Sequence, residues 1–280
     1  MQIIDAHQHF WIFDAEQDSW INLDMEKIRR DFLPDELSAI LKEKQINGCV
    51  AVQSRQNEED NFFLLECAQK NAFVKGIVGW IDLCSDRVEA DLKKYSRYPL
   101  IKGFRHVLEA EKDLAFMLKS SFLKGISLLH AYGFTYDILI RPEHLEYALQ
   151  LVEQFPEQRF VIDHMAKPAI KNNEITQWQH DIKLLAGHNN VYCKISGLVT
   201  EADWHSWTIQ DLEPYLGIVF AAFGPNRVMY GSDWPVCNLA GGYNLFFETM
   251  NTYTANFSTA DQELFWAGNA TTFYKLNEDN

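Results

Sequence analysis

The chain has 280 residues, 47% of them hydrophobic, and a formal net charge of −14. This acidic balance argues against nucleic acid and against an anionic membrane as partners, because both bind basic surfaces. The length is sufficient for one large core, and no linker-like stretch or change of composition divides it. We therefore expect a single domain over residues 1–280.

The cysteines indicate a reducing environment. They are five in number, so they cannot all pair, and no two have Cys-x-x-Cys spacing. The first ten residues lack the basic start and the apolar stretch of a secretory signal, and no apolar run approaches the length of a membrane span. We expect a soluble, cytoplasmic protein with reduced thiols. The sequence leaves open whether it forms a homo-oligomer.

Apolar, β-branched runs recur eight times along the chain. They cover residues 3–5, 48–53, 74–80, 100–105, 134–140, 160–163, 191–195 and 228–231. Segments with the apolar spacing of helices lie between most of them, for example 34–43, 61–70 and 142–154. Near the end, Ser258 and Asp261 have the spacing of a helix capping box.

This alternation predicts a closed (β/α)8 barrel of the TIM type, because strands that alternate with helices pair in parallel and have both faces covered. No break in the alternation indicates an open, doubly wound sheet. The first run is not followed by the Gly-x-Gly-x-x-Gly pattern of a dinucleotide-binding fold. In such a barrel the catalytic groups lie at the carboxyl ends of the strands.

The first run leads into a pair of histidines, His7 and His9. Because side chains two residues apart in a strand point the same way, both imidazoles can reach one point. Such a pair is typical of a divalent-metal chelate or of a paired polarising group. A histidine-rich surface turn is the alternative interpretation. Two later runs also end in metal-capable side chains, His164 and Asp233, which favours a site.

Polar or aromatic residues close three other runs as well. They are Gln53 and Arg55 after the second run, Trp80 and Asp82 after the third, and Arg105 and His106 after the fourth. The agreement between strand ends and chemistry predicts a catalytic site at this end of the barrel.

With these features the chain resembles the amidohydrolase superfamily, and within it the hydrolases that open fucono- and rhamnono-lactones. The resemblance covers nearly the whole chain. It is carried by His7-Gln8-His9-Phe10-Trp11, Val78-Gly79-Trp80-Ile81-Asp82-Leu83, Lys102-Gly103-Phe104-Arg105-His106, Asp163-His164-Met165-Ala166-Lys167-Pro168, Lys194-Ile195-Ser196-Gly197 and Tyr230-Gly231-Ser232-Asp233-Trp234-Pro235. The His-x-His pair alone is a weak signal, whereas the ordered combination is specific.

The resemblance implies catalytic roles for four residues. Asp233 is the general base that takes a proton from the hydrolytic water, and His164 polarises the lactone carbonyl. His7 and His9 stabilise the developing negative charge, with or without a divalent ion such as zinc. The structural alternatives are an aspartate that caps a turn and a histidine held in packing.

The sequence departs from the binuclear members of the superfamily. Those proteins carry a carboxylated lysine at the end of the fourth strand, where this chain has Arg105, with Lys102 at the start of the run. They also have a histidine after the fifth strand, where this chain has Arg141 followed by Pro142. We therefore expect one divalent ion or none. Its ligands would be His7, His9, His164 and Asp233.

Six residues are candidates for substrate binding: Arg105, Gln53, Arg55, Lys167, Trp80 and Trp234. Arg105 suits a carboxylate, a hydroxyl or an oxyanion, and its alternative is a buried pair with Asp82 or Glu201. Gln53 and Arg55 are candidates for binding hydroxyls. Lys167 either contacts a substrate oxygen or pairs with a carboxylate. The tryptophans either form apolar walls for a sugar ring or belong to the core. We expect Pro142 to direct Arg141 into a helix start.

We predict a hydrolase that opens the lactone of a sugar acid, of the fucono- or rhamnono-lactone type, by attack of water at the carboxyl face of the barrel. The expected partner is this small lactone. A metal-dependent decarboxylase built on a related barrel is one alternative, and release of carbon dioxide would identify it. A hydrolase of aromatic-derived lactones is the second alternative, and a non-catalytic sugar-binding barrel is the third.

Overall fold

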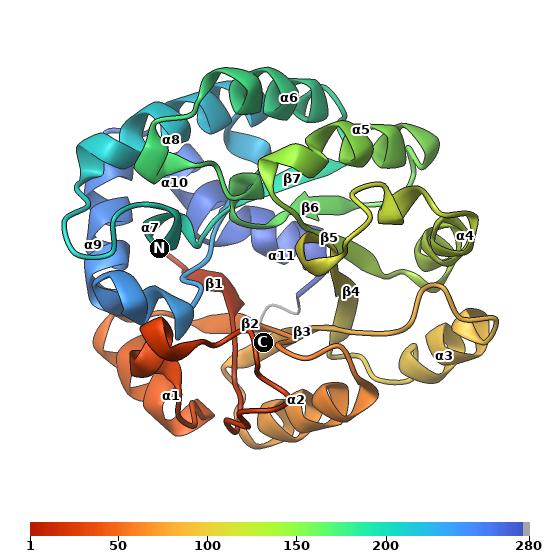
Figure 1. Cartoon of the computed structure of the whole chain (residues 1–280). Coiled ribbons are helices and arrows are strands. Elements are labelled where there is room, and N and C mark those ends of the chain that lie inside the picture. The colour runs from red at the N-terminus through yellow and green to blue at the C-terminus, as the bar shows by residue number, and fades with distance from the viewer. Residues whose placement is uncertain (277–280) are drawn as a thin grey trace.

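The computed structural model describes residues 1–276 as a ring of eight parallel strands surrounded by helices (Figure 1). The strands are paired in chain order, each with the next. They are β1 (Ile4–Gln8), β2 (Gly48–Val52), β3 (Val74–Gly79), β4 (Ile101–Val107), β5 (Thr135–Leu139), β6 (Phe160–Ile162), β7 (Val191–Ile195) and β8 (Val228–Tyr230). This is the (β/α)8 barrel that the sequence predicts.

The helices cover the outside of the ring. They are α1 (Pro34–Glu43), α2 (Glu58–Lys70), α3 (Val88–Tyr95), α4 (Ser120–Leu129), α5 (Leu145–Gln154), α6 (Thr176–Ala186), α7 (Leu198–Glu201), α8 (Ile209–Phe223), α9 (Gly242–Thr254), α10 (Thr259–Glu263) and α11 (Asn269–Tyr274). The predicted capping box is present in part. The Ser258 hydroxyl accepts a hydrogen bond from the Asp261 N–H (3.1 Å) at the start of α10, but the Asp261 carboxylate accepts from the Ser258 hydroxyl (2.8 Å) and not from its N–H.

The eight apolar runs all form strands. The one that differs most from its prediction is β1, which continues to Gln8 and so includes His7. Its register on β2 shifts between Asp5 and Gln8. The shift lets β1 present both apolar Ala6 and polar His7 to the interior, where simple alternation would send one of them outward.

An apolar layer fills the part of the barrel interior that α11 closes. It consists of Ile4, Ala6, Val50, Val52, Val78, Val161 and Met229 from the strands, packed against Ala267, Ala270, Phe273, Tyr274 and Leu276. The end of α11 meets the beginnings of strands. Lys102, at the start of β4, donates a hydrogen bond to the carbonyl of Lys275 (3.2 Å), and Arg159, directly before β6, contacts the carbonyl of Phe273. In Figure 1, α11 lies across the middle of the ring.

The barrel closes between β1 and the segment that follows β8. The Asp233 N–H donates to the carbonyl of His7 (2.8 Å), and the His9 N–H donates to the carbonyl of Trp234 (2.7 Å). The seam of the barrel therefore fixes Asp233 beside the two histidines of the first strand.

Two expectations about the environment of the chain can be compared with the structure. The five cysteines are all free, and four of them are buried. Among residues 1–276, none of the helices combines the length and the apolar character that a membrane crossing needs.

Candidate active site

A cavity of about 670 Å³ opens at the carboxyl ends of the strands, a size typical of a small-molecule site. Its walls come from loops after β1, β2, β4, β5, β6 and β8. Its lining includes His9, Trp20, Arg55, Arg105, Glu109, Arg141, His164, Lys167 and Asp233.

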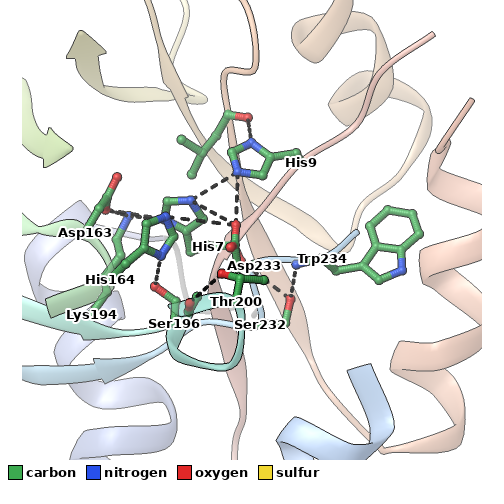
Figure 2. A network of polar contacts seen from close by, with 12 residues as sticks. His7, His9, Asp163, His164, Lys194, Ser196, Thr200, Ser232, Asp233 and Trp234 are labelled. Atoms are coloured by element: carbon green, nitrogen blue, oxygen red, sulfur yellow. Dashed lines mark hydrogen bonds and ion pairs between the residues drawn. The ribbon is translucent and has the colours of Figure 1, made fainter. Parts of the chain in front are cut away.

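Three histidines converge on the carboxylate of Asp233 (Figure 2). The Asp233 Oδ1 atom lies 3.4 Å from His9 Nε2, 3.8 Å from His7 Nε2 and 4.0 Å from His164 Nε2. The Nε2 atoms of His7 and His9 are 3.2 Å apart. The structure thus brings together the four predicted catalytic residues. His7 is fully buried and does not line the cavity, whereas the other three do.

The backbone that presents His164 and Asp233 is strained. Residues His164 to Lys167 all have positive φ angles, between 48° and 59°, and Asp233 has a φ of 57°. Residues other than glycine adopt this left-handed backbone conformation at an energetic cost, and such residues cluster at functional sites. Gly197 fits between the two groups, because a Cβ added there would lie 2.6 Å from His164 Nδ1 and 3.1 Å from Asp233 Oδ2.

A charged layer lies inside the barrel next to the histidines. It consists of Arg105 on β4, Asp137 on β5, Asp163 directly after β6, and Lys194 on β7. Lys194 Nζ lies 2.6 Å from Asp137 Oδ2 and 3.0 Å from Asp163 Oδ1, and Arg105 Nη1 lies 3.1 Å from Asp163 Oδ2. Two cations thus balance two carboxylates, as buried charges require.

The protonation states follow from burial and from these neighbours. Burial acts to raise the pKa of Asp233, but the imidazoles of His164, His9 and His7 together hold it below its ordinary value. Burial lowers the pKa of His164 to about 4 and lowers the pKa of His7 well below 6.5. At neutral pH the site therefore has an ionised carboxylate beside the neutral imidazoles of His164 and His7.

The site has the donors that one divalent ion requires. His7, His164 and Asp233 each offer a ligand atom, and these atoms all lie within 4.8 Å of one another. Neutral imidazoles with a carboxylate suit zinc and similar ions. His9, the fourth predicted ligand, is not one of these three, although its Nδ1 lies 2.7 Å from the Val52 carbonyl and its Nε2 lies 3.4 Å from Asp233 Oδ1. No other such cluster of three His, Cys, Asp or Glu residues occurs within residues 1–276.

Three of the six predicted substrate-binding residues line the cavity: Arg105, Arg55 and Lys167. Each also holds a carboxylate. Arg105 binds Asp163 rather than Asp82 or Glu201. Arg55 binds Asp18 (2.7 Å), and Lys167 binds Glu109 (2.6 Å).

The other three do not lie on the cavity wall. The Gln53 side chain is fully buried and donates to the backbone carbonyl of Arg105 (3.2 Å), so it supports that residue from behind. Trp234 is fully buried and packs its ring on Phe10 and Phe32. Trp80 is fixed through its backbone to Asn61 and is absent from the lining. Of the tryptophans in the chain, Trp20 is the one among the lining residues.

Several site residues have no role in the sequence-based prediction. Lys194 and Asp163 lie in segments that carry the family resemblance, but they were given no role. A charged residue within an apolar strand run is the signal that could have identified Lys194. Glu109 lies in a polar loop without any such signal. Arg141 stands at a helix start, as expected, because it directly precedes the short 3-10 helix Pro142–His144. Its side chain lines the cavity, with Nε 3.2 Å from Glu109 Oε2.

Comparison with known proteins identifies the family. The amidohydrolase family model matches residues 4–276, which is nearly the whole chain. The chain belongs to the amidohydrolase family. Among curated amidohydrolase relatives, the L-fucono-1,5-lactonase of Burkholderia multivorans is 34% identical over 286 residues, which cover 98% of this chain and 96% of that protein.

Solved amidohydrolase structures agree with this result. A crystal structure of an amidohydrolase from Burkholderia multivorans with bound zinc superposes with a TM-score of 0.96 at 34% identity, and covers 99% of this chain and 100% of that one. The 5-carboxyvanillate decarboxylase of Sphingomonas paucimobilis has a TM-score of 0.65 at 11% identity over 99% of both chains. That second likeness shows a shared fold.

Proposed function

We propose that the protein hydrolyses the lactone of a sugar acid, of the fucono- or rhamnono-lactone type. The observation that carries the proposal is an ionised carboxylate, Asp233, placed beside the neutral ring of His164 at the floor of a cavity of substrate size. An ionised carboxylate accepts a proton from water, and a neutral imidazole can donate a hydrogen bond to a carbonyl. The similarity to an L-fucono-1,5-lactonase over nearly the full length supports the same reaction.

The proposed reaction begins when Asp233 takes a proton from a water molecule. The resulting hydroxide adds to the lactone carbonyl carbon, and the carbonyl oxygen becomes an oxyanion. His164 faces that oxygen through Nε2, because its Nδ1 is occupied by the Ser196 hydroxyl (2.8 Å). Arg105 is a second donor on the cavity wall.

The tetrahedral intermediate collapses as the bond to the ring oxygen breaks. Asp233 then returns the proton to the leaving alkoxide, so that the open hydroxy acid is formed and the base is regenerated. The low pKa of Asp233 keeps it ionised, although it also limits the driving force for proton uptake. His7 contacts Asp233 from the buried side and acts through it, since it does not line the cavity.

A divalent ion is compatible with this site and would be held by His7, His9, His164 and Asp233. Such an ion, when bound, polarises a carbonyl and lowers the pKa of a bound water. Arg55, Arg105 and Lys167 would line the lactone site in either case, whereas His164 Nε2 would bind the ion in place of donating to the carbonyl.

The charges on the cavity wall favour a neutral, hydroxylated ring over a dicarboxylate. Arg55, Arg105 and Lys167 each pair with a carboxylate of the protein, and Arg141 lies against Glu109. A substrate with several carboxylates needs cations that are free to bind it, because each desolvated carboxylate requires a charge-assisted partner. Paired ions instead offer alternating donors and acceptors, which suit hydroxyl groups.

A panel of substrates tests the proposal directly. The purified protein is offered L-fucono-1,5-lactone, L-rhamnono-γ-lactone, 2-pyrone-4,6-dicarboxylate and 5-carboxyvanillate. Acid release is followed with a pH indicator, and carbon dioxide release with a coupled assay. We expect acid release from the sugar lactones, with kcat/KM at least about tenfold above that for the pyrone, and no carbon dioxide. A tenfold preference for the pyrone would contradict the substrate class, and carbon dioxide release would contradict the reaction.

We also propose a cytoplasmic location, which the five free cysteines support.

A further inference from the structure

We propose that Lys194 acts as a positioning residue that fixes the tautomer of His7 with the proton on Nε2, so that in the metal-free protein His7 donates a hydrogen bond towards His9 and Asp233. The proposal concerns which ring nitrogen of His7 carries the proton, and it does not depend on which lactone the protein opens. It assigns a function to a buried lysine that the proposed reaction leaves unused.

His7 Nδ1 has two close polar neighbours, Lys194 and Asp163. Lys194 Nζ lies 3.2 Å from this nitrogen with hydrogen-bond geometry (Figure 2). An ammonium group can only donate, so His7 Nδ1 must accept and therefore has no proton. Asp163 Oδ1 is the rival partner at 3.3 Å, but the Lys194 ammonium lies closer to that oxygen, at 3.0 Å, and balances its charge.

The other side of the ring faces His9. His9 Nδ1 lies 2.7 Å from the carbonyl of Val52, which can only accept, so His9 carries its proton there and presents a lone pair on Nε2. That lone pair faces His7 Nε2 at 3.2 Å. A proton on His7 Nε2 satisfies it, whereas two lone pairs at this distance would repel each other.

One contact opposes this arrangement. Arg105 Nη1 lies 3.4 Å from His7 Nε2, and a hydrogen bond from it would require a lone pair there. The contact is longer than the one from Lys194, and Nη1 has a carboxylate partner, Asp163 Oδ2, at 3.1 Å. If Arg105 took this lone pair, Lys194 would face a second donor on Nδ1. A neutral imidazole has a lone pair on only one nitrogen, so it can accept a hydrogen bond from only one of the two cations. The shorter contact favours Lys194.

The arrangement has a consequence for metal binding. A histidine binds a metal ion through an unprotonated nitrogen. An ion at His7 Nε2 would therefore have to displace the proton that sits on Nε2 because Lys194 donates to Nδ1. The proton would move to Nδ1, where Asp163 Oδ1 is the available acceptor. Lys194 therefore opposes metal binding at His7, and it favours the metal-free arrangement of the site.

Nitrogen NMR of the unaltered protein is the first test. Protein labelled with ¹⁵N-histidine is freed of metal with a chelator, and long-range ¹H–¹⁵N spectra distinguish protonated from unprotonated ring nitrogens. The spectrum of His7→Asn assigns the His7 signals. We expect the proton on Nε2. A proton on Nδ1 of His7 in the unaltered protein would overturn the proposal.

The second test removes the lysine without leaving an uncompensated charge. In the double variant Lys194→Met with Asp137→Asn, one cation and one carboxylate disappear together. Without the lysine, Asp163 Oδ1 is the remaining partner of His7 Nδ1, so we expect the form of His7 with its proton on Nδ1 to gain population against the opposing contact with His9. We also expect Zn²⁺ to bind at least about tenfold more tightly in competition with a chromophoric chelator, since outer partners of a ligand typically change metal affinity by about 10- to 100-fold.

The single variant Asp137→Asn is the matched control, because it keeps the lysine that contacts His7. We expect it to retain the tautomer and a Zn²⁺ affinity close to that of the unaltered protein. A double variant with unchanged tautomer and unchanged affinity would refute the role of Lys194. If the double variant does not fold, the spectrum of the unaltered protein decides alone.

Discussion

The apolar layer and the charged layer occupy the same barrel but stabilise it in different ways. In the apolar layer, valines and other side chains of the strands pack against α11 without directional contacts. In the charged layer, Lys194, Arg105, Asp137 and Asp163 are almost fully buried and hold one another at distances of 2.6 to 3.1 Å. One hydrogen bond joins the layers, from the Tyr274 hydroxyl on α11 to Asp137 (2.7 Å).

The difference indicates what each layer contributes. Burial of apolar surface stabilises a fold in proportion to area, and tolerates changes of shape. A buried ion network loses hydration energy that its internal attraction barely recovers, so a packed apolar core of the same volume is often equally stable. The charged layer is therefore best understood as the support of the catalytic histidines. Perturbing the two layers should affect different properties of the protein.

The largest effect is expected at Asp233, which contacts the histidines that the charged layer supports. Asp233→Asn should lower kcat by at least about a thousandfold, because the amide retains the shape but cannot accept a proton, and general-base loss typically costs about 10²–10⁴ in rate. Steady-state kinetics on the preferred lactone measure it. Asp86→Asn, on the exposed surface, is the control. Near-normal turnover in a folded Asp233→Asn protein would remove Asp233 from the mechanism.

The apolar layer should respond in stability and not in chemistry. Phe273 is 1% exposed and packs in the apolar layer, so Phe273→Ala should lower the free energy of unfolding by about 3 kcal/mol. We expect kcat to stay within about twofold, because the cavity lies at the other end of the strands. Phe62→Ala, at a position 42% exposed, is the matched control and should cost about 1 kcal/mol or less in urea unfolding. A large loss of kcat in folded Phe273→Ala would show that the two layers are coupled.

The pH dependence should reveal the neutral His164. Burial lowers its pKa to about 4, so kcat/KM should be constant at neutral pH and fall as the pH decreases through about 4. Below that pH an imidazolium would pair with Asp233 and prevent it from accepting the water proton. An acid limb near 6.5 would show that His164 is not desolvated as the structure indicates.

The same proton affects stability and sets a condition for the experiment. The unfolded chain binds it near 6.5 and the native chain only near 4, so the free energy of unfolding decreases as the pH falls from 6.5 to 4. Short exposures to acid, with circular dichroism as the control of folding, separate the two effects.

The smallest effect is expected at the cavity wall. Lys167→Met removes a cation that is bound to Glu109, and Glu109 keeps its contact with Arg141. We expect KM for a sugar lactone to rise by up to about tenfold, because that factor corresponds to the free energy of about one hydrogen bond. We expect kcat to change little. Lys171→Met, at an exposed side chain, is the control. A fall in kcat with unchanged KM would assign Lys167 to the chemistry.

Much of the fold could be predicted from the sequence, because its strands are apolar runs and its helices have regular spacing. The predicted end of β1 came too early, since His7 and Gln8 are polar but lie in the strand. Asp233 and the three histidines around it were also predicted, because a strand end in a barrel has a defined place. The charged layer was predicted only in part. Arg105 was a candidate at a strand end, whereas Asp137 and Lys194 lie within apolar strand runs, and the sequence does not show that their side chains meet.

The wrong placements have one physical cause. Proximity to a strand end does not reveal the direction of the side chain, so Gln53 and Trp234 were expected in the cavity but point into protein. Arg141 stands at the expected helix start, yet its side chain reaches the cavity. The left-handed turn at residues 164–167 contains no glycine, so no local preference indicates how it aims His164.

The position of α11 also matters for synthesis of the protein on the ribosome. All eight strands leave the exit tunnel before Phe273 and Tyr274 do, and until then the valines that these residues cover have nothing to pack against. A nascent chain that has completed β8 is therefore a ring with an uncovered apolar interior, which is a target for chaperones and a risk for aggregation. We expect translation stalled just before residue 269 to yield a protease-sensitive chain, and a stall far enough downstream to release residue 276 to yield a resistant one.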